Sequence, residues 1–122
     1  MEYSENKPIY LQITDRIMDD IVTGIFPEEG RLPSVREYAG EAEVNPNTVM
    51  RSFDWLQQQQ IIYNKRGIGF FVLPGAFNRI LEMRKDIFFN KEADLFFLRL
   101  KTLGISPQHL AELYTDFLNR KK

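Results

Sequence analysis

The chain has 122 residues, a formal net charge of −1, 43% hydrophobic and 27% charged residues, and no cysteine. This composition is typical of a folded, soluble protein with one compact domain, or one small domain plus an appendage. The lack of cysteine excludes disulfides and cysteine-ligated metals, and a single histidine, His109, excludes a multi-histidine metal cluster within one chain. No apolar run approaches the roughly 18 residues of a transmembrane helix, and the polar N-terminus does not resemble a secretory signal. We therefore expect a cytoplasmic protein with no membrane partner.

The charge is unevenly distributed along the chain. Residues 1–74 carry seven Lys/Arg against eleven Asp/Glu, a net charge of −4, whereas residues 75–122 carry nine against six, a net charge of +3. The sequence has no basic tail that could bind nucleic acid through bulk charge. A nucleic-acid interface would therefore depend on where individual cations are placed.

The first 60 residues predict three helices. Isoleucines recur every four residues in an amphipathic pattern over residues 8–25, and Gly24 ends that pattern. After a turn-rich connector, Ser34 and Glu37 have the spacing of a capping box, which starts a short helix that runs to about Ala42.

The third helix follows after one tight turn. Asn45 can cap it and Pro46 fits its first position, so we expect it to run from about Pro46 to Gln58. Its expected buried stripe comprises Val49, Phe53 and Leu56. Two helices joined by a tight turn are typical of a helix-turn-helix.

A β-hairpin is predicted directly after the third helix. Residues 61–63 and 70–73 are β-prone, and residues 64–69 between them form a basic tip that contains glycine. A hairpin in this position is typical of the winged form of the helix-turn-helix. Pro74-Gly75 is the clearest boundary in the chain.

The residues after this boundary predict a two-helix tail. One long helical pattern spans residues 76–103, Gly104 stops it, and Ser106 with Pro107 starts a second helix. The residues expected to face inward from the second helix are Leu110, Leu113, Tyr114 and Phe117. Phenylalanines on opposite faces of the first helix cannot all be buried within one chain, so a symmetric second copy is the simplest partner. The candidate dimerisation residues are Phe88, Phe89, Phe96 and Phe97.

The winged helix-turn-helix pattern indicates how the chain would contact DNA. An exposed helix of about 12 residues fits the major groove, and the N–H groups at its N-terminus attract phosphate. The hairpin tip suits the adjacent minor groove, where cations meet a negative potential and glycine permits close backbone approach. The residues in these places are Asn45, Asn47, Thr48, Arg51, Lys65, Arg66 and Gly67.

Each of these local signals also has a purely structural explanation. The Ser34 hydroxyl is committed to the backbone, Asn45 belongs to a turn in any fold, and the hairpin glycines can serve turn geometry alone. Lys65 and Arg66 can form a solvated loop tip, and Arg36 alone can be a surface residue. The order of the elements is therefore more informative than any single residue. Paired carboxylates, a nucleophile–base set and a phosphate-binding glycine loop are all missing from the sequence, so we expect no enzymatic activity and no cofactor.

Four spaced segments resemble the GntR-type winged-helix transcription regulators of bacteria. They are Pro8–Ile13, Leu32–Ala39, Val44–Val49 and Arg66–Val72, and they occur in one consistent order over about residues 7–73. The resemblance implies that Arg36, Asn45, Asn47, Thr48 and Gly67 approach DNA. From their charge and position, we also expect Arg31, Arg51, Lys65 and Arg66 to approach DNA. Ser34, at the start of the second predicted helix, is a further candidate. Many relatives have a basic residue where Pro46 or Met50 stands. The third predicted helix, which would be the recognition helix, therefore has fewer cations here.

The short tail resembles that of the YtrA-like subfamily, in which such a tail serves dimerisation. The expected fold is mainly α with a small β-hairpin wing: a winged helix-turn-helix DNA-binding domain at residues 1–74, followed by a two-helix dimerisation region at residues 75–122. The expected function is sequence-specific binding of double-stranded DNA by a homodimer on a palindromic operator, with repression as the default outcome.

Two alternatives stay open at this point. The net charge of −4 in the N-terminal part suits a winged helix that binds a protein instead of DNA, which salt dependence of DNA binding would test. A small-molecule effector is compatible with the main interpretation, and its pocket would lie at the dimer interface or between the tail and the winged domain. Thermal-shift measurements with metabolites would test that expectation.

Overall fold

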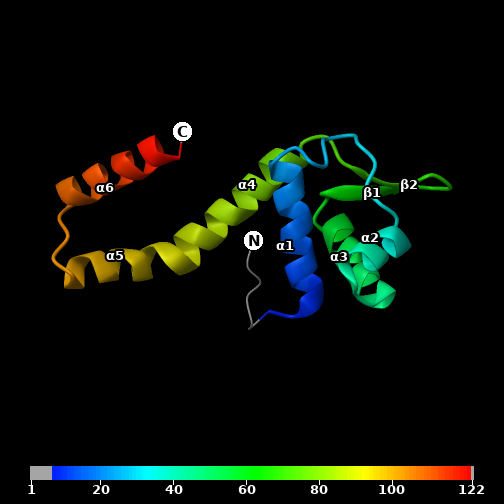
Figure 1. Ribbon diagram of the computed structural model, residues 1–122, viewed down its shortest axis with the longest axis horizontal. Helices are drawn as coiled ribbons and strands as arrows, with labels where there is room; N and C mark the ends of the chain where they lie inside the picture. Colours follow the sequence, from blue (N-terminus) through cyan, green and yellow to red (C-terminus); the bar gives the residue numbers. More distant parts are fainter. Residues whose placement is uncertain (1–6, 122) are drawn as a thin grey trace. The chain divides into compact units, whose positions relative to one another are not determined.

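The computed structural model describes residues 7–121, whose contacts divide the chain into two units on either side of the Glu82–Met83 bond. The first unit contains α1 (Ile9–Val22), α2 (Val35–Ala42), α3 (Pro46–Gln58), the strands β1 (Ile62–Lys65) and β2 (Gly69–Val72), and the first turns of α4 (Ala76–Ile87) (Figure 1). The second unit contains the rest of α4, a π-helical segment (Phe88–Glu92), α5 (Ala93–Thr102) and α6 (Pro107–Arg120). The unit boundary thus falls inside α4.

Three helices, α2, α3 and α6, begin at residues whose side chains cap them. The Glu37 N–H donates to Ser34 Oγ at 3.1 Å, and the Ser34 N–H donates to Glu37 Oε1 at 3.0 Å, which completes the capping box of α2. Asn45 Oδ1 accepts the Asn47 N–H at 2.8 Å at the start of α3, and Ser106 caps α6 in a similar way. These contacts satisfy backbone donors that have no partner within the helix.

The core of the first unit is centred on α3. Its predicted stripe is fully buried, and the Phe53 ring packs edge-on against Tyr38 of α2, at 6.4 Å between centroids, and Phe70 of β2, at 4.9 Å. The hydroxyl of Ser52, also buried, donates to the Tyr10 carbonyl of α1 at 2.7 Å. Because α1, α2 and the hairpin all contact one side of α3, its opposite side is left to solvent.

The hairpin has a tighter turn than the sequence predicts. β1 reaches Lys65, which pairs with Gly69, so only residues 66–68 form the tip. The Ile68 N–H donates to the Lys65 carbonyl at 2.9 Å, and Gly67 has φ +80°. That left-handed conformation favours glycine and closes the turn, whereas β-propensity, on which the prediction rests, carries no information about turn closure.

The long helical pattern of the tail is interrupted by one π turn. Phe88–Glu92 forms a π-helical segment between α4 and α5, and Gly104, with φ +72°, follows α5 as predicted. A π turn adds one residue to the helical repeat, but the helix itself continues through it. A prediction based on the 3.6-residue period therefore describes the segment as one continuous helix.

The second unit has almost no core. Among its described residues only Ala93 is buried, and α6 buries none of its side chains. The prediction that the apolar residues of α6 face inward is wrong for a single chain, because Leu110 is half-buried while Leu113, Tyr114 and Phe117 are exposed. Within residues 7–121, no helix combines the length and the apolar character that crossing a membrane requires.

Candidate nucleic-acid interface

The N-terminal turn of α3 presents several predicted DNA contacts to solvent. Asn45, Asn47 and Arg51 are exposed, and Thr48 is half-buried. Because Asn45 Oδ1 already accepts the Asn47 N–H, the amide NH2 group of Asn45 is the part that can donate outward. The side chain of Asn47 takes no part in that cap, so both its amide nitrogen and its oxygen can read a base edge.

Arg51 lies at the junction between α3 and α1. Its guanidinium carbon is 4.2 Å from the centroid of the Tyr10 ring, which is a cation–π contact. The carbonyl of Tyr10 also accepts the Ser52 hydroxyl. α1 therefore orients both the recognition helix and one of its cations. The role of Tyr10 is not apparent from the sequence, because the contact joins two helices that are far apart in the chain.

The wing carries three of the predicted residues at or beside its tip. Lys65, Arg66 and Gly67 are all exposed, and Lys65 Nζ lies 5.6 Å from the centroid of the Phe71 ring on the opposite strand. The space around the absent Cβ of Gly67 is open. Its positive φ supports the turn-geometry explanation, and the open space leaves room for a close approach by another backbone.

Arg31 lies at the base of the wing, although it precedes the hairpin by thirty residues of sequence. A β-bridge joins Arg31 to Phe71, and the Leu32 N–H donates to the Phe70 carbonyl at 2.8 Å. A Cβ atom on Gly69 would lie 3.1 Å from Arg31 Nε, and Gly69 has φ +141°. Glycine at this position lets the guanidinium of Arg31 lie directly against the hairpin backbone.

α2 contributes Ser34 and Arg36 at its N-terminus. Arg36 is exposed, whereas the Ser34 hydroxyl is engaged by Glu37, because its oxygen accepts the Glu37 N–H and its side chain also interacts with the Glu37 carboxylate. The Ser34 backbone N–H, and secondly its side chain, lower the pKa of the Glu37 carboxyl. Glu37 therefore stays ionised at neutral pH, where its charge suits the helix N-terminus.

The five predicted DNA-contacting cations are Arg31, Arg36, Arg51, Lys65 and Arg66, and all are exposed. In the part of the chain that the structure describes, none of the five forms an ion pair with a carboxylate. Three of them belong to the hairpin or to the connector that pairs with it. The positions of these five side chains thus create a local cationic surface, although residues 1–74 carry a net negative charge.

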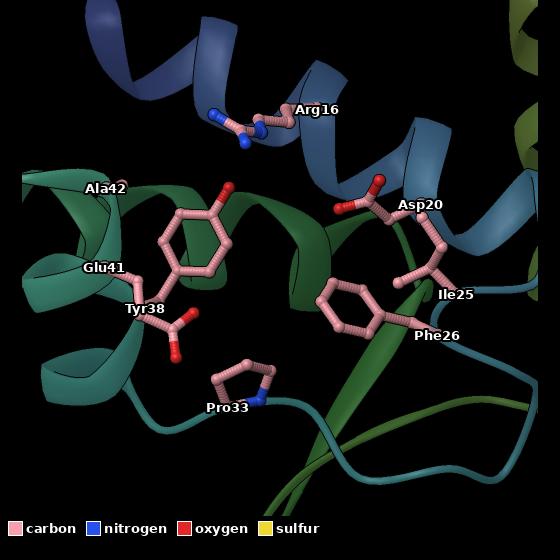
Figure 2. Close-up of a pocket in the computed structure, with 8 residues that line it drawn as sticks. All are labelled: Arg16, Asp20, Ile25, Phe26, Pro33, Tyr38, Glu41 and Ala42. Atoms are coloured by element: carbon pink, nitrogen blue, oxygen red, sulfur yellow. The ribbon is translucent and has the colours of Figure 1, made fainter.

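A separate pocket lies between α1, α2 and the connector that joins them. It encloses about 270 Å³ and is lined by Arg16, Asp20, Ile25, Phe26, Pro33, Tyr38, Glu41 and Ala42 (Figure 2). Burial raises the pKa of Asp20, while Arg16 acts in the opposite direction and Asp19 adds to the rise. This pocket belongs to the winged-helix unit, a different location from the two sites expected for an effector. Among residues 7–121, no group of three or more His, Cys, Asp or Glu residues is placed to hold a metal ion.

A recognition helix packed on two supporting helices, followed by a glycine-tipped hairpin with exposed cations, defines a winged helix-turn-helix regulator. The family model for bacterial regulatory proteins of the gntR family matches residues 9–72. The HTH-type transcriptional regulator YhcF of Bacillus subtilis is 33% identical over 111 residues, which are 91% of this chain and 90% of that protein. The chain therefore belongs to the GntR family of bacterial transcriptional regulators, as its sequence predicts.

Further comparisons agree with this assignment. The HTH-type transcriptional repressor YtrA of Bacillus subtilis is 36% identical over 75 residues, 62% of this chain and 58% of that protein. A crystal structure assigned to the GntR family, from Bacteroides thetaiotaomicron, is 54% identical with a TM-score of 0.79 over 94% of this chain and 100% of that chain. The N-terminal domain of AraR, solved with a mutant ORR3, is 25% identical with a TM-score of 0.53 over 57% of this chain and 99% of that chain.

These comparisons confirm the mainly α winged fold and the relationship to YtrA-like regulators. They also confirm that the chain is a DNA-binding transcriptional regulator and not an enzyme.

Proposed function

We propose that this regulator binds a palindromic operator as a homodimer and represses transcription by covering the promoter. Residues 1–74 are the DNA-binding domain in this proposal, and residues 75–122 are the dimerisation region. The observation that carries the dimer is the apolar surface of the second unit, which one chain leaves uncovered.

The uncovered surface is large and continuous along the tail helices. The four candidate dimerisation residues Phe88, Phe89, Phe96 and Phe97 are between 41% and 64% exposed. An open groove of about 850 Å³ is lined by Phe88, Phe96, Leu100, Pro107, Leu110, Ala111, Leu113 and Tyr114. Monomeric proteins rarely expose apolar patches of this extent, and a second copy presents a matching patch by symmetry.

The proposed DNA contacts follow from the exposed surfaces of the first unit. α3 enters the major groove with Asn47 and Thr48 toward base edges, and Arg36 and Arg51 bind phosphates on either side. The wing tip, with Lys65, Arg66 and Gly67, enters the neighbouring minor groove, and Arg31 at its base binds backbone phosphate. Asn45 supplies its amide N–H donors, and Ser34 lies beside Arg36 at the N-terminus of α2, which faces phosphate in this proposal. A twofold axis then places two such sites about 34–36 Å apart, one DNA turn.

Repression is supported by the names of two relatives. YtrA and NagR, both of Bacillus subtilis, are transcriptional repressors by name. Promoter occlusion needs only tight operator binding, without a contact to polymerase. A regulator of bacterial genes acts in the cytoplasm, where the chromosome lies, and an effector that shifts the dimer would change occupancy of the operator.

The test is a fluorescence-anisotropy titration of the full chain against DNA upstream of its own gene, with random-sequence DNA of equal length as competitor. We expect two protomers per site, preference over the competitor, and affinity that falls steeply between two salt concentrations because phosphate contacts release counterions. Binding without preference, or one protomer per site, would contradict the proposal. No binding at either salt concentration would favour a winged helix that binds a protein instead.

A further inference from the structure

We propose that the pocket between α1, α2 and their connector is a binding site for a small organic cation, a protonated amine that carries an apolar group. The ammonium end of this ligand pairs with Asp20, and its apolar end packs against Phe26 and Pro33. The inference concerns the winged-helix unit alone, so it does not depend on the proposed dimer or on operator binding.

The walls of this pocket are held in place by hydrogen bonds and by the core. The Phe26 N–H donates to the Asp20 carbonyl at 3.0 Å, which folds the start of the connector back against the end of α1. Tyr38 is only 8% exposed, and its ring packs against Phe53 in the core. Farther along, the connector is joined to β2 through the Leu32 N–H. A ligand therefore meets a site that is already formed, as small-molecule sites usually are.

The size and the apolar lining of the pocket suit a ligand with a single ring or a short branched chain. Its volume of about 270 Å³ is slightly below the roughly 300–1,000 Å³ of pockets for drug-sized molecules. Figure 2 shows the rings of Phe26 and Tyr38 approaching each other from two sides, with Pro33 between them in the view. Ile25, which also lines the pocket, is 65% exposed, so a ligand that covers it removes apolar surface from water.

The charged groups around the pocket favour a cation over an anion. Two carboxylates, Asp20 and Glu41, line it together with one cation, Arg16, and Asp19 adds a negative charge beside Asp20. In Figure 2 the Asp20 carboxylate lies on the same side of the pocket as Phe26, whereas the Arg16 guanidinium lies on the other side. Within residues 7–121, neither of the two lining carboxylates accepts a hydrogen bond or forms an ion pair. An ammonium group can therefore donate to either of them.

Asp20 is the carboxylate that gains more from such a ligand. It is half-buried, and burial raises its pKa, whereas Glu41 is exposed. A carboxylate that has lost part of its hydration without gaining a hydrogen-bond donor recovers that loss when an ammonium group donates to it. An ammonium group beside Asp20 also leaves the rest of the ligand against the ring of Phe26, whose face attracts cations.

The experiment uses phenethylamine as the probe, because this compound joins a protonated amine to one aromatic ring. Phenylpropionate keeps the ring but carries a negative charge, and ethylamine keeps the amine but lacks the ring. Titration of the isotope-labelled full chain, followed by NMR, reports both the affinity and the location of binding. We expect phenethylamine to bind with a micromolar to millimolar Kd and to shift the backbone signals of Ile25, Phe26 and Ala42. Both comparison compounds should bind at least about tenfold more weakly.

Two variants test the assignment of the ammonium partner. Asp20→Asn keeps the shape of the side chain but removes its charge, so it should weaken phenethylamine binding by about tenfold. Asp54→Asn removes the same charge from an exposed position of α3 that does not line the pocket, and it should bind phenethylamine as the wild type does. Wild-type affinity in Asp20→Asn would overturn the proposal.

Three results with the wild type would also overturn it. They are the lack of any shift at millimolar phenethylamine, equal binding of phenethylamine and phenylpropionate, and shifts confined to the tail groove around Phe88 and Leu110. The last result would show that the ring binds to the apolar surface of the tail. If Asp20→Asn fails to fold, the comparison of phenethylamine with phenylpropionate on the wild type decides alone. Operator binding plays no part in these titrations, so their outcome and that of the proposed function are separate.

Discussion

The two units of this chain bury their apolar residues in opposite ways. In the winged-helix unit, large side chains from α1, α3, the hairpin and the start of α4 form a buried core with Phe53 at its centre. In the tail unit, Ala93 alone is buried among the described residues, while phenylalanines and leucines of α5 and α6 stay exposed. Both units contain well-capped helices, so secondary structure does not account for the difference.

This difference indicates where the stability of each unit originates. Burial of apolar surface is the main favourable term in folding, and the first unit obtains it from its own residues. In the proposed dimer the tail obtains it from a second copy, which would couple the stability of the tail to protein concentration. Substitutions in the two units should therefore change different observables.

The largest effect is expected from Phe53→Ala in the winged-helix core. Phe53 is fully buried and contacts rings from α2 and β2, so its truncation should lower the free energy of unfolding by about 3–5 kcal/mol. Thermal unfolding by circular dichroism measures this loss. DNA binding should disappear while the tail still associates. Gln58→Ala, at an exposed position of the same helix, is the control and should leave the melting temperature nearly unchanged. Loss of association in Phe53→Ala would show that the two units are not independent.

A smaller effect, on association only, is expected from Phe96→Glu in the tail. A charge in the centre of the proposed dimer surface should weaken the dimer by about 2–4 kcal/mol, the range of interface hot spots. Sedimentation equilibrium measures the dissociation constant. The winged-helix unit should melt as in the wild type, and operator affinity should fall toward that of one half-site. Gln108→Glu introduces the same side chain at an exposed polar position of α6 and should leave the dimer intact. An unchanged dimer in Phe96→Glu would place the interface elsewhere.

The contrast between the units also explains which features the sequence could predict. Caps and turns depend on a few adjacent residues, so Ser34, Asn45 and Ser106 mark their helices correctly. The Tyr10–Arg51 contact and the Glu28–Gly75 hydrogen bond join distant segments, and no local pattern marks them. The π turn contains no glycine or proline that would mark a change in the helix. The prediction that the apolar residues of α6 face inward was wrong for a related reason. Periodicity identifies an apolar face of a helix but does not identify what covers it.

Within the winged-helix unit, two exposed residues should separate specificity from affinity. Asn47→Ala should cost about 1–3 kcal/mol and relax selectivity at particular base pairs, because Asn47 is proposed to read base edges. Arg66→Ala should weaken binding to all sequences and lower the salt slope by about one, because Arg66 is proposed to meet backbone charge. Selection from a randomised operator library, with titrations at several salt concentrations, measures both quantities. If both variants bind like the wild type, the assigned DNA-facing surface is wrong.

The smallest effect concerns the α2 cap and its dependence on pH. The Ser34 backbone N–H, helped by the Ser34 side chain, lowers the pKa of Glu37 in the folded state. A lowered carboxyl pKa stabilises the fold above the pKa of the unfolded chain, and this contribution is lost as pH falls through the folded value. Glu37→Gln keeps an acceptor oxygen but cannot ionise, so it should melt below the wild type at neutral pH and approach it under acidic conditions. Thermal melts over a pH series measure the convergence, and Glu41→Gln, on the same helix outside the capping box, provides the baseline. A melting difference that persists unchanged at acidic pH would mean that the Glu37 charge does not stabilise α2.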